Sequence, residues 1–132
     1  MNNNIIKIAS LIAEELQEYK AEVSFAPEYD FPDLNNNRIC VVVPVTTEYE
    51  KVSRSQTKLK YRIEVGLFYR AKTLDMSARL AEADVIINKF LQKRLGDAIC
   101  LKAELVPMYD AESLRTKNQL TSVVGLNFEE VQ

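Results

Sequence analysis

Residues 58–70 read Lys-Leu-Lys-Tyr-Arg-Ile-Glu-Val-Gly-Leu-Phe-Tyr-Arg, and an apolar side chain occupies every second position of this stretch. The apolar set comprises Leu59, Tyr61, Ile63, Val65, Leu67 and Tyr69, and charged residues fill most of the positions between them. Successive side chains of a strand point to opposite faces, so the pattern predicts a β-strand with one face on a core and the other largely in water. Gly66 interrupts the polar face, which predicts a bulge or the close approach of another backbone.

Further strands are predicted on both sides of this segment along the chain. Residues 38–45 are β-branched and apolar on both faces, as in a buried central strand, and we expect Pro44 near the end of that strand. Weaker strand patterns occupy residues 22–26, about 99–108 and about 120–131. In the last of these, one face is shared by Leu120, Val124, Leu126 and Phe128, and Gly125 interrupts the other face.

Two segments have the three-to-four spacing of amphipathic helices. The first runs from Ile5 to Tyr19 with Asn4 as a plausible N-cap. The second begins at Asp75 or Ser77 and ends at about Arg94. Gly96 is expected to stop it. The expected apolar stripe of the second helix is Leu80, Ala83, Ile87, Phe90 and Leu91, widened by Val85 and Ile86.

The predicted element order is α-β-β-β-α-β-β, with no internal repeat and no linker that would divide the chain. Helices separated from mostly antiparallel strands are typical of the α+β class. We therefore expect residues 1–132 to form a single α+β domain, a mostly antiparallel mixed sheet packed against two helices.

The composition of the chain argues against several classes of protein. The chain has 132 residues, of which 47% are hydrophobic and 27% charged, as in an ordinary globular protein. Its formal net charge of −2 lacks the basic excess of a dedicated nucleic-acid binder. The N-terminus shows neither a signal peptide nor a membrane span, so we expect folding in a reducing cytosol. Cys40 and Cys100 are expected to be buried reduced thiols, with a disulfide between adjacent strands as the alternative.

No catalytic, cofactor or metal site is predicted. The chain contains no histidine and only 3 glycines, which removes the commonest general base and the glycine-rich phosphate loops. The carboxylate pairs Glu14 with Glu18 and Asp30 with Asp33 have a spacing that could hold Mg²⁺ or do acid–base work. A solvated helix face and an Asp-rich turn explain the same residues more simply.

The segment Thr46–Lys60 is the strongest candidate for binding a partner. It is polar and carries both charge signs, and its Thr46–Thr57 part is read as an exposed connection or the tip of a long hairpin. Tyrosines beside basic residues suggest a single-strand nucleic-acid platform. Alternation, however, places Tyr61 and Tyr69 inward and the basic side chains outward. The remaining interpretations are a plain hairpin tip or an arm that orders against a neighbouring subunit through Tyr49, Lys51, Arg54 and Lys58.

Taken together, the pattern resembles the tail-completion or tail-terminator subunits of long-tailed bacteriophages. The resemblance rests on the opening helix Ile5–Tyr19, the strand 39–44 ending in proline, the alternating strand 61–70, a second helix, and the terminal strand 123–128. It extends over most of the chain, as a pattern of elements in which no single residue is diagnostic.

The resemblance implies a structural protein of the virion tail, present in the bacterial cytoplasm during assembly. Such subunits form a ring, typically a hexamer, that stops tail-tube polymerisation and offers a surface to the head connector. The implied partners are therefore copies of itself, the tail tube protein and the head connector protein, with no membrane. Three alternatives remain open from the residues: a neck or head–tail joining protein, an adaptor outside phages, and a small ligand-binding domain or enzyme.

Overall fold

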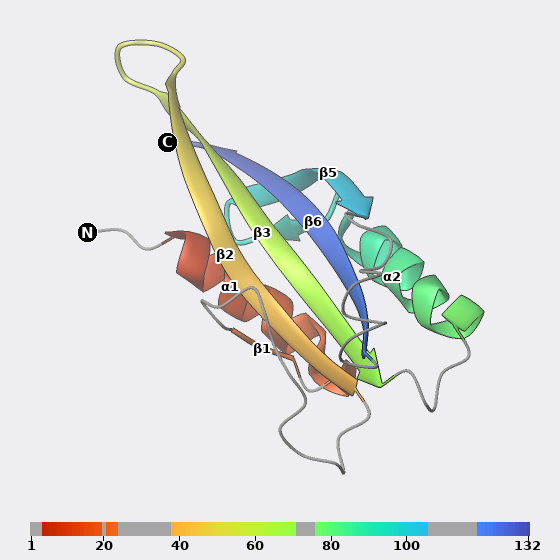
Figure 1. Cartoon of the computed structure of the whole chain (residues 1–132). Coiled ribbons are helices and arrows are strands. Elements are labelled where there is room, and N and C mark those ends of the chain that lie inside the picture. Colours follow the sequence, from red (N-terminus) through yellow and green to blue (C-terminus); the bar gives the residue numbers. More distant parts are fainter. Residues whose placement is uncertain (1–3, 20, 24–37, 71–75, 106–118) are drawn as a thin grey trace.

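The computed structural model describes residues 4–19, 21–23, 38–70, 76–105 and 119–132, and it confirms the α+β class and the predicted order of helices and strands. Figure 1 shows the arrangement. The elements are α1 (Asn4–Glu15), the 3-10 turn η1 (Gln17–Tyr19), β1 (Glu22–Val23), β2 (Arg38–Lys51), β3 (Thr57–Arg70), α2 (Met76–Phe90), β4 (Arg94–Leu95), β5 (Ala98–Leu105) and β6 (Gln119–Val131). The two-residue β4 was not expected.

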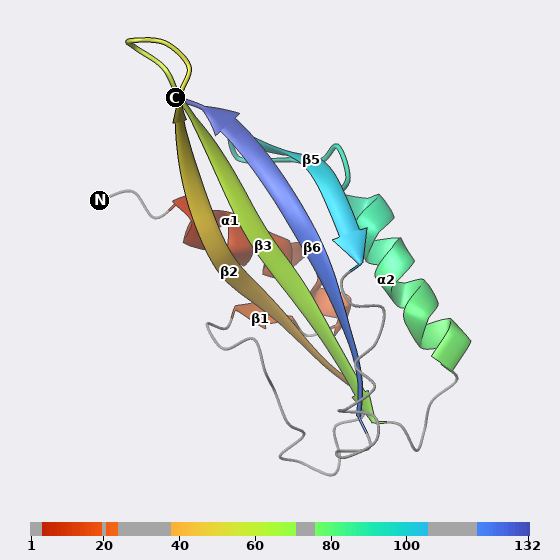
Figure 2. The same ribbon diagram turned by 45° about the horizontal axis from the view of Figure 1, so that its top comes forward.

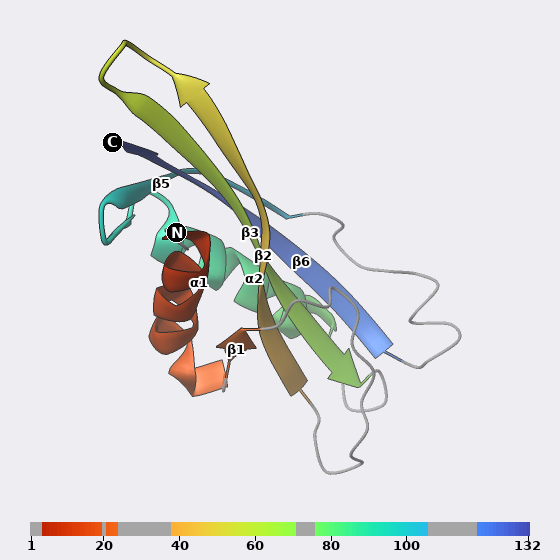
Figure 3. The ribbon, with the colours of Figure 1, turned by 90° about the vertical axis from the view of Figure 1, so that its left-hand side faces the viewer.

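The strands form one 6-stranded sheet in the order β1-β2-β3-β6-β5-β4. Only β1 and β2 pair in parallel; the other neighbours are antiparallel. The three longest strands, β2, β3 and β6, cross side by side in the middle (Figures 1 and 2). Both helices lie on the same side of these strands (Figure 3), α1 against β2 and α2 against β5 and β6. The sheet therefore has a helix-covered inner face and an opposite, outer face.

The core forms where the alternating face of β3 meets the helices. Its five described apolar residues, Leu59, Tyr61, Ile63, Val65 and Leu67, are all buried, as predicted; the side chain of Tyr69 lies outside the described residues. They pack in one cluster with residues of α1, α2 and β6, including Ile8, Ile12, Leu16, Ile86, Phe90, Val124, Leu126 and Phe128. The period of two in β3 and the helical period of α1 therefore define the two sides of one core.

Strand β2 is longer than expected, and the predicted position of Pro44 was wrong. The strand continues through Thr46 to Lys51, so the connection to β3 shrinks to residues 52–56. Pro44 lies in the middle of β2, at a register shift towards β3 and past the last residue that pairs with β1. A proline is tolerated there because a bulge on an unpaired edge needs no ladder hydrogen bond from its nitrogen. No register shift occurs at Gly66, so of the two expectations there, a bulge or the close approach of another backbone, the bulge is wrong.

The end of α2 also differs from the prediction. The helix stops at Phe90, and Gln92 takes a positive φ of 68°, which breaks the helical path. The backbone of Gln92 then donates to the carbonyl of Cys100 at 2.8 Å, so the chain enters the sheet instead of continuing the helix. Gly96, with φ of 60°, makes the turn between β4 and β5 and is not the helix stop.

The buried stripe of α2 is rotated from the predicted one. Ala83, Ile86 and Phe90 are buried, and Ile87 is partly buried, whereas Val85 and Leu91 are exposed.

The first helix is shorter than expected, since the regular α-helix ends at Glu15 and a 3-10 turn follows. The expected strand at residues 22–26 is observed for Glu22–Val23, and the rest of it lies outside the described residues.

Candidate interaction surface

The β2–β3 hairpin projects beyond the rest of the sheet at the end where the chain terminates (Figure 2). Strand β6 pairs with β3 as far as Lys58 opposite Val131, and Gln132 exchanges two backbone hydrogen bonds of 2.8 Å with Thr57. Beyond that point only the turn residues 52–56 continue; we call residues 49–58, the turn with the strand ends that carry it, the hairpin arm. Its turn is closed by hydrogen bonds from the amides of Val52 and Ser53 to the carbonyl of Gln56. The predicted hairpin tip is thus an ordered turn, residues 52–56, at the end of the sheet.

The structure brings the four predicted interface residues together on this arm but not on one face. Tyr49 pairs with Leu59 and Lys51 with Thr57, so both side chains lie on the inner side of the ribbon. Lys58 pairs with Glu50 on the outer side, and Arg54 is exposed in the turn. The arm therefore presents a basic tip with an exposed tyrosine on one flank, since Tyr49 is 73% exposed.

The outer face of the sheet is charged with both signs in the described residues. Its polar members by register include Glu48, Glu50, Lys58, Lys60, Arg62, Glu64, Lys102, Glu104, Asn127 and Glu129, while Val41, Val43, Ile99, Val123 and Val131 are its apolar members. The Nζ of Lys60 lies 3.1 Å from a carboxylate oxygen of Glu50 on the next strand. The hydrogen bond with Lys60 lowers the pKa of Glu50, and the hydrogen bond with Glu50 raises the pKa of Lys60. Cross-strand ion pairs of this kind stabilise the pairing register of strands on a solvent-exposed face of a sheet.

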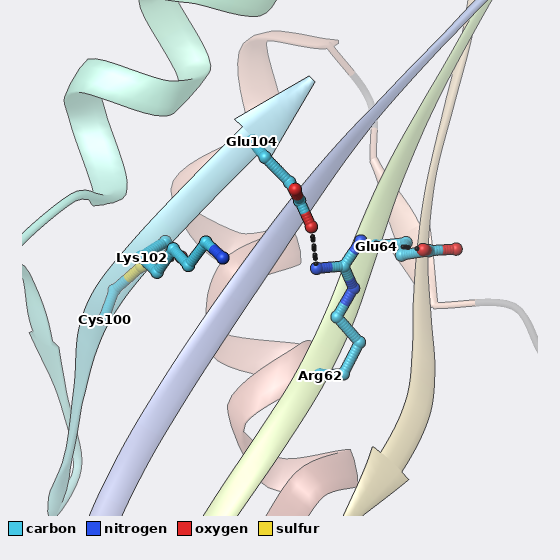
Figure 4. Close-up of polar contacts among 5 residues, drawn as sticks. All are labelled: Arg62, Glu64, Cys100, Lys102 and Glu104. Carbon is cyan, nitrogen blue, oxygen red and sulfur yellow. Dashed lines mark hydrogen bonds and ion pairs between the residues drawn. The ribbon is translucent and has the colours of Figure 1, made fainter. Parts of the chain in front are cut away.

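Arg62 bridges three strands on this face. It reaches from β3 across β6 to β5, where its Nη1 donates to Glu104 at 2.7 Å, while its Nη2 lies 3.2 Å from Glu64 on its own strand (Figure 4). The register explains the geometry, because Glu64, Gly125 and Glu104 form one row across the sheet. Gly125 has no side chain, so the guanidinium can lie above it between two carboxylates. The hydrogen bond from Arg62 lowers the pKa of Glu104 below its ordinary value.

Replacing Gly125 with alanine is expected to displace the guanidinium, because a Cβ at that position would overlap Arg62. The stability change should stay within about 1 kcal/mol, since exposed ion pairs contribute little. The measurement is the ¹⁵N spectrum of the arginine side chains, in which the Arg62 signals should move towards those of a free arginine. Gly96→Ala is the control: nothing lies within 4 Å of its added Cβ, so it strains only the turn. Unmoved Arg62 signals in Gly125→Ala would contradict this account of the glycine.

A buried polar network on the inner face was missed at the sequence level. The hydroxyl of Tyr61 donates to Glu130 Oε1, and Asn4 Nδ2 donates to the same oxygen at 3.0 Å. Tyr61 is only 2% exposed and Glu130 only 7%. Burial, and next the hydrogen bond to Glu130, raises the pKa of Tyr61. The network ties the first residue of α1 to β3 and β6. The alternation of β6 does carry a signal for it, because Glu130 follows Phe128 on the core face.

A cleft opens beside this network, between α1 and the turn from β4 to β5. Its volume is about 280 Å³. The apolar residues Ile8, Leu11 and Leu95 line it, together with the acidic residues Asp97 and Glu130. Lys7, Asn4 and Gln132 also border the cleft, and the side chain of Lys7 is exposed. The cleft thus combines apolar residues with two acidic ones.

Of the two carboxylate pairs considered for chemistry, only Glu14 with Glu18 lies in the described structure. Glu14 is exposed, and Glu18 lies 3.8 Å from the Nζ of Lys89 in an ion pair between η1 and α2. Asp30 and Asp33 lie outside the described residues. Within the described ranges, no group of three or more acidic or cysteine side chains is placed to hold a metal ion.

The two cysteines are buried and are not joined by a disulfide, as expected from the sequence. Cys100 lies on β5, and burial raises the pKa of its thiol above the ordinary value. A buried thiol with a raised pKa is a poor nucleophile at neutral pH.

Neither helix of the described chain has the length and apolar character that a membrane crossing requires.

Comparisons with known protein families and with curated proteins find no similar protein. No protein-family model matches the chain, and no curated protein is significantly similar to it.

Proposed function

We propose that this protein is a structural subunit of a bacteriophage or prophage tail, in which it terminates the tail tube as an oligomeric ring and joins it to the head connector. The observation that carries the proposal is the hairpin arm. Its turn extends past the end of the sheet (Figure 2), and the arm exposes Tyr49 and Val52, which are 73% and 52% exposed. The resemblance in element order supplies the phage-tail part of the proposal.

The arm leaves apolar surface in contact with water unless a partner covers it. Its inner flank carries the large aromatic ring of Tyr49 in solvent instead of a polar residue. Aromatic side chains are enriched at protein interfaces, where their large apolar area is desolvated. A neighbouring subunit would desolvate Tyr49 and Val52 and order the tip.

The outer face supports a protein partner more than a nucleic acid. Its lysines, arginine and glutamates alternate in sign and partly neutralise one another, as in the pairs Lys60–Glu50 and Arg62–Glu104. Phosphate backbones favour a surface of one positive sign. A shallow groove of about 310 Å³ runs over this face between β2 and β5. Mixed charge and a shallow groove suit contact with another protein surface, whether a tube subunit or a copy of this chain.

The test is self-assembly measured by light scattering across a concentration series, with negative-stain images of any large species. We expect closed rings for the natural protein. Tyr49→Ser combined with Val52→Ser should reduce ring formation at least about tenfold, because loss of two exposed apolar anchors removes binding energy without touching the core. The melting temperature should stay unchanged, since both side chains are exposed.

The matched control is Val85→Ser, which removes a similarly exposed valine, 55% exposed, from α2. It should leave assembly unchanged. A second measurement adds the protein to polymerising tube protein of the same phage, where a terminator limits tube length. Monomers at every concentration together with unlimited tube growth would reject the proposal. Rings that tolerate the Tyr49 and Val52 changes would instead reject the arm as their interface.

A neck or head–tail joining protein is the second candidate, since it needs the same oligomerising domain. The same tube assay separates the two, because a neck protein would leave tube length unchanged and bind the connector instead.

A further inference from the structure

The cleft between α1 and the β4–β5 turn has the chemistry of a socket for a long basic side chain. An arginine or lysine combines an aliphatic stem with a cationic head. The apolar residues Ile8, Leu11 and Leu95 suit the stem, and the acidic residues Asp97 and Glu130 suit the head. Lys7 reduces the negative charge of the cleft but does not cancel it.

Glu130 provides the second observation. Both hydrogen bonds that it accepts, from Tyr61 and Asn4, end on Oε1. In the described part of the chain no buried side-chain oxygen or nitrogen lacks a partner. Its Oε2 therefore lies in the small exposed fraction of the side chain, on the cleft that Glu130 lines. The Glu130 side chain is only 7% exposed, and one of its oxygens faces the cleft. This oxygen is therefore positioned to accept a hydrogen bond from a charged donor.

A donor of the right kind stands at the tip of the hairpin arm. Arg54 is exposed between two serines in the turn, with Lys51 and Lys58 behind it on the two strands. The turn projects past the end of the sheet (Figures 1 and 2), and no residue of the turn lines the chain's own cleft. The tip is therefore available to the cleft of another molecule.

We infer that the basic tip of the hairpin arm of one copy docks into the cleft of a second copy, with Arg54 facing Asp97 and Glu130. This inference rests on the proposed self-assembly and names its contact. Tip and cleft are different surfaces of the same chain, so the contact is heterologous and can repeat from copy to copy until a ring closes. Opposite charges on the two surfaces also disfavour tip-to-tip and cleft-to-cleft pairing.

The first test is charge reversal. Asp97→Arg, at an exposed turn position, is expected to weaken self-association by about tenfold or more, and Arg54→Asp should do the same. The double variant, with the two charges exchanged, should recover most of the association. Asp84→Arg on the exposed face of α2 is the matched control and should have no effect. Failure of the exchanged pair to recover association would overturn the inference, because general charge repulsion predicts no recovery.

The second test is a crosslink between two different chains. A chain with Arg54→Cys is mixed with a chain carrying Asp97→Cys and mildly oxidised; the native cysteines are buried and should not react. Docking predicts a disulfide-linked dimer from the mixture and none when Asp84→Cys replaces Asp97→Cys. Absence of the dimer up to about millimolar protein, where even weak contacts form, would overturn the inference.

The two proposals fail in different ways. Rings that show neither the crosslink nor the charge-exchange recovery leave the tail proposal standing and reject this contact. A crosslinked species that never closes into rings and never limits tube length keeps the contact and rejects the terminator function.

Discussion

Replacing Phe128 with alanine should lower the free energy of unfolding by about 3–5 kcal/mol, the largest effect we expect from any single substitution in this chain. The ring of Phe128 is fully buried, opposite Tyr61 of β3 and Cys100 of β5. It belongs to the cluster that joins the sheet to both helices. Truncation leaves a cavity that the central strands cannot close, because their ladders hold them on both sides.

The measurement is urea and thermal unfolding, in which the melting temperature should fall by about 10–20 °C. Val131→Ala, three residues further along β6, is the control, since Val131 is 53% exposed. It should change stability by no more than about 0.5 kcal/mol. Equal effects of the two substitutions would mean that the inner face of β6 is not covered as described.

Replacing Tyr61 with phenylalanine should cost about 1–3 kcal/mol, although it removes only one oxygen. The lost hydroxyl donates to Glu130, whose carboxylate is almost fully buried. Glu130 would then keep only the amide of Asn4 on that oxygen. A buried carboxylate that loses a donor bears a desolvation cost with no compensating contact.

The cost of Tyr61→Phe should also depend on pH in the alkaline range. Burial and the bond to Glu130 raise the pKa of Tyr61 above the ordinary value of 10.0. The unfolded chain therefore loses this proton at a lower pH than the folded chain does. The contribution of Tyr61 is fully present below pH 10 and is lost as the pH rises towards the raised pKa. The difference in stability between the natural protein and Tyr61→Phe should shrink above pH 10.

Denaturant unfolding at pH 7, 9, 10 and 11 checks both statements. Tyr49→Phe is the matched control, because Tyr49 is 73% exposed and its hydroxyl lies in water. It should leave stability unchanged at pH 7 and keep the alkaline loss of the natural protein. A constant difference between the natural protein and Tyr61→Phe across this range would contradict the raised pKa.

The sheet and its core could be predicted because their signal is local. In β3, five apolar side chains at alternate positions are buried, and nothing but the period of two is needed to assign them. Cys40, Val41, Val42 and Val43 are buried on both faces of β2, as their unbroken apolar run indicated. Ile8, Ile12 and Leu16 follow the helical period of α1 in the same way.

The errors occur where a neighbour in space overrides a local preference. Pro44 normally ends a strand, but here β2 continues because β3 supplies a long partner on one side and β1 leaves the other side unpaired. Gly96 normally ends a helix, but α2 ends earlier because the backbone of Gln92 bonds to Cys100. Thr46–Lys51 lacks an apolar period and is nevertheless a strand, because its partner β3 holds it there.

The sequence by itself determined the α+β class, the inner face of the central strand and the exposed, charged character of the hairpin arm. These features follow from the period of the apolar residues and from the charges within one segment. Only the tertiary structure decided which distant residues meet: Arg62 with Glu104 above Gly125, and Tyr61 with Glu130 and Asn4. Such contacts depend on strand order and register across the sheet, because residues up to 126 positions apart become neighbours only when the strands pair.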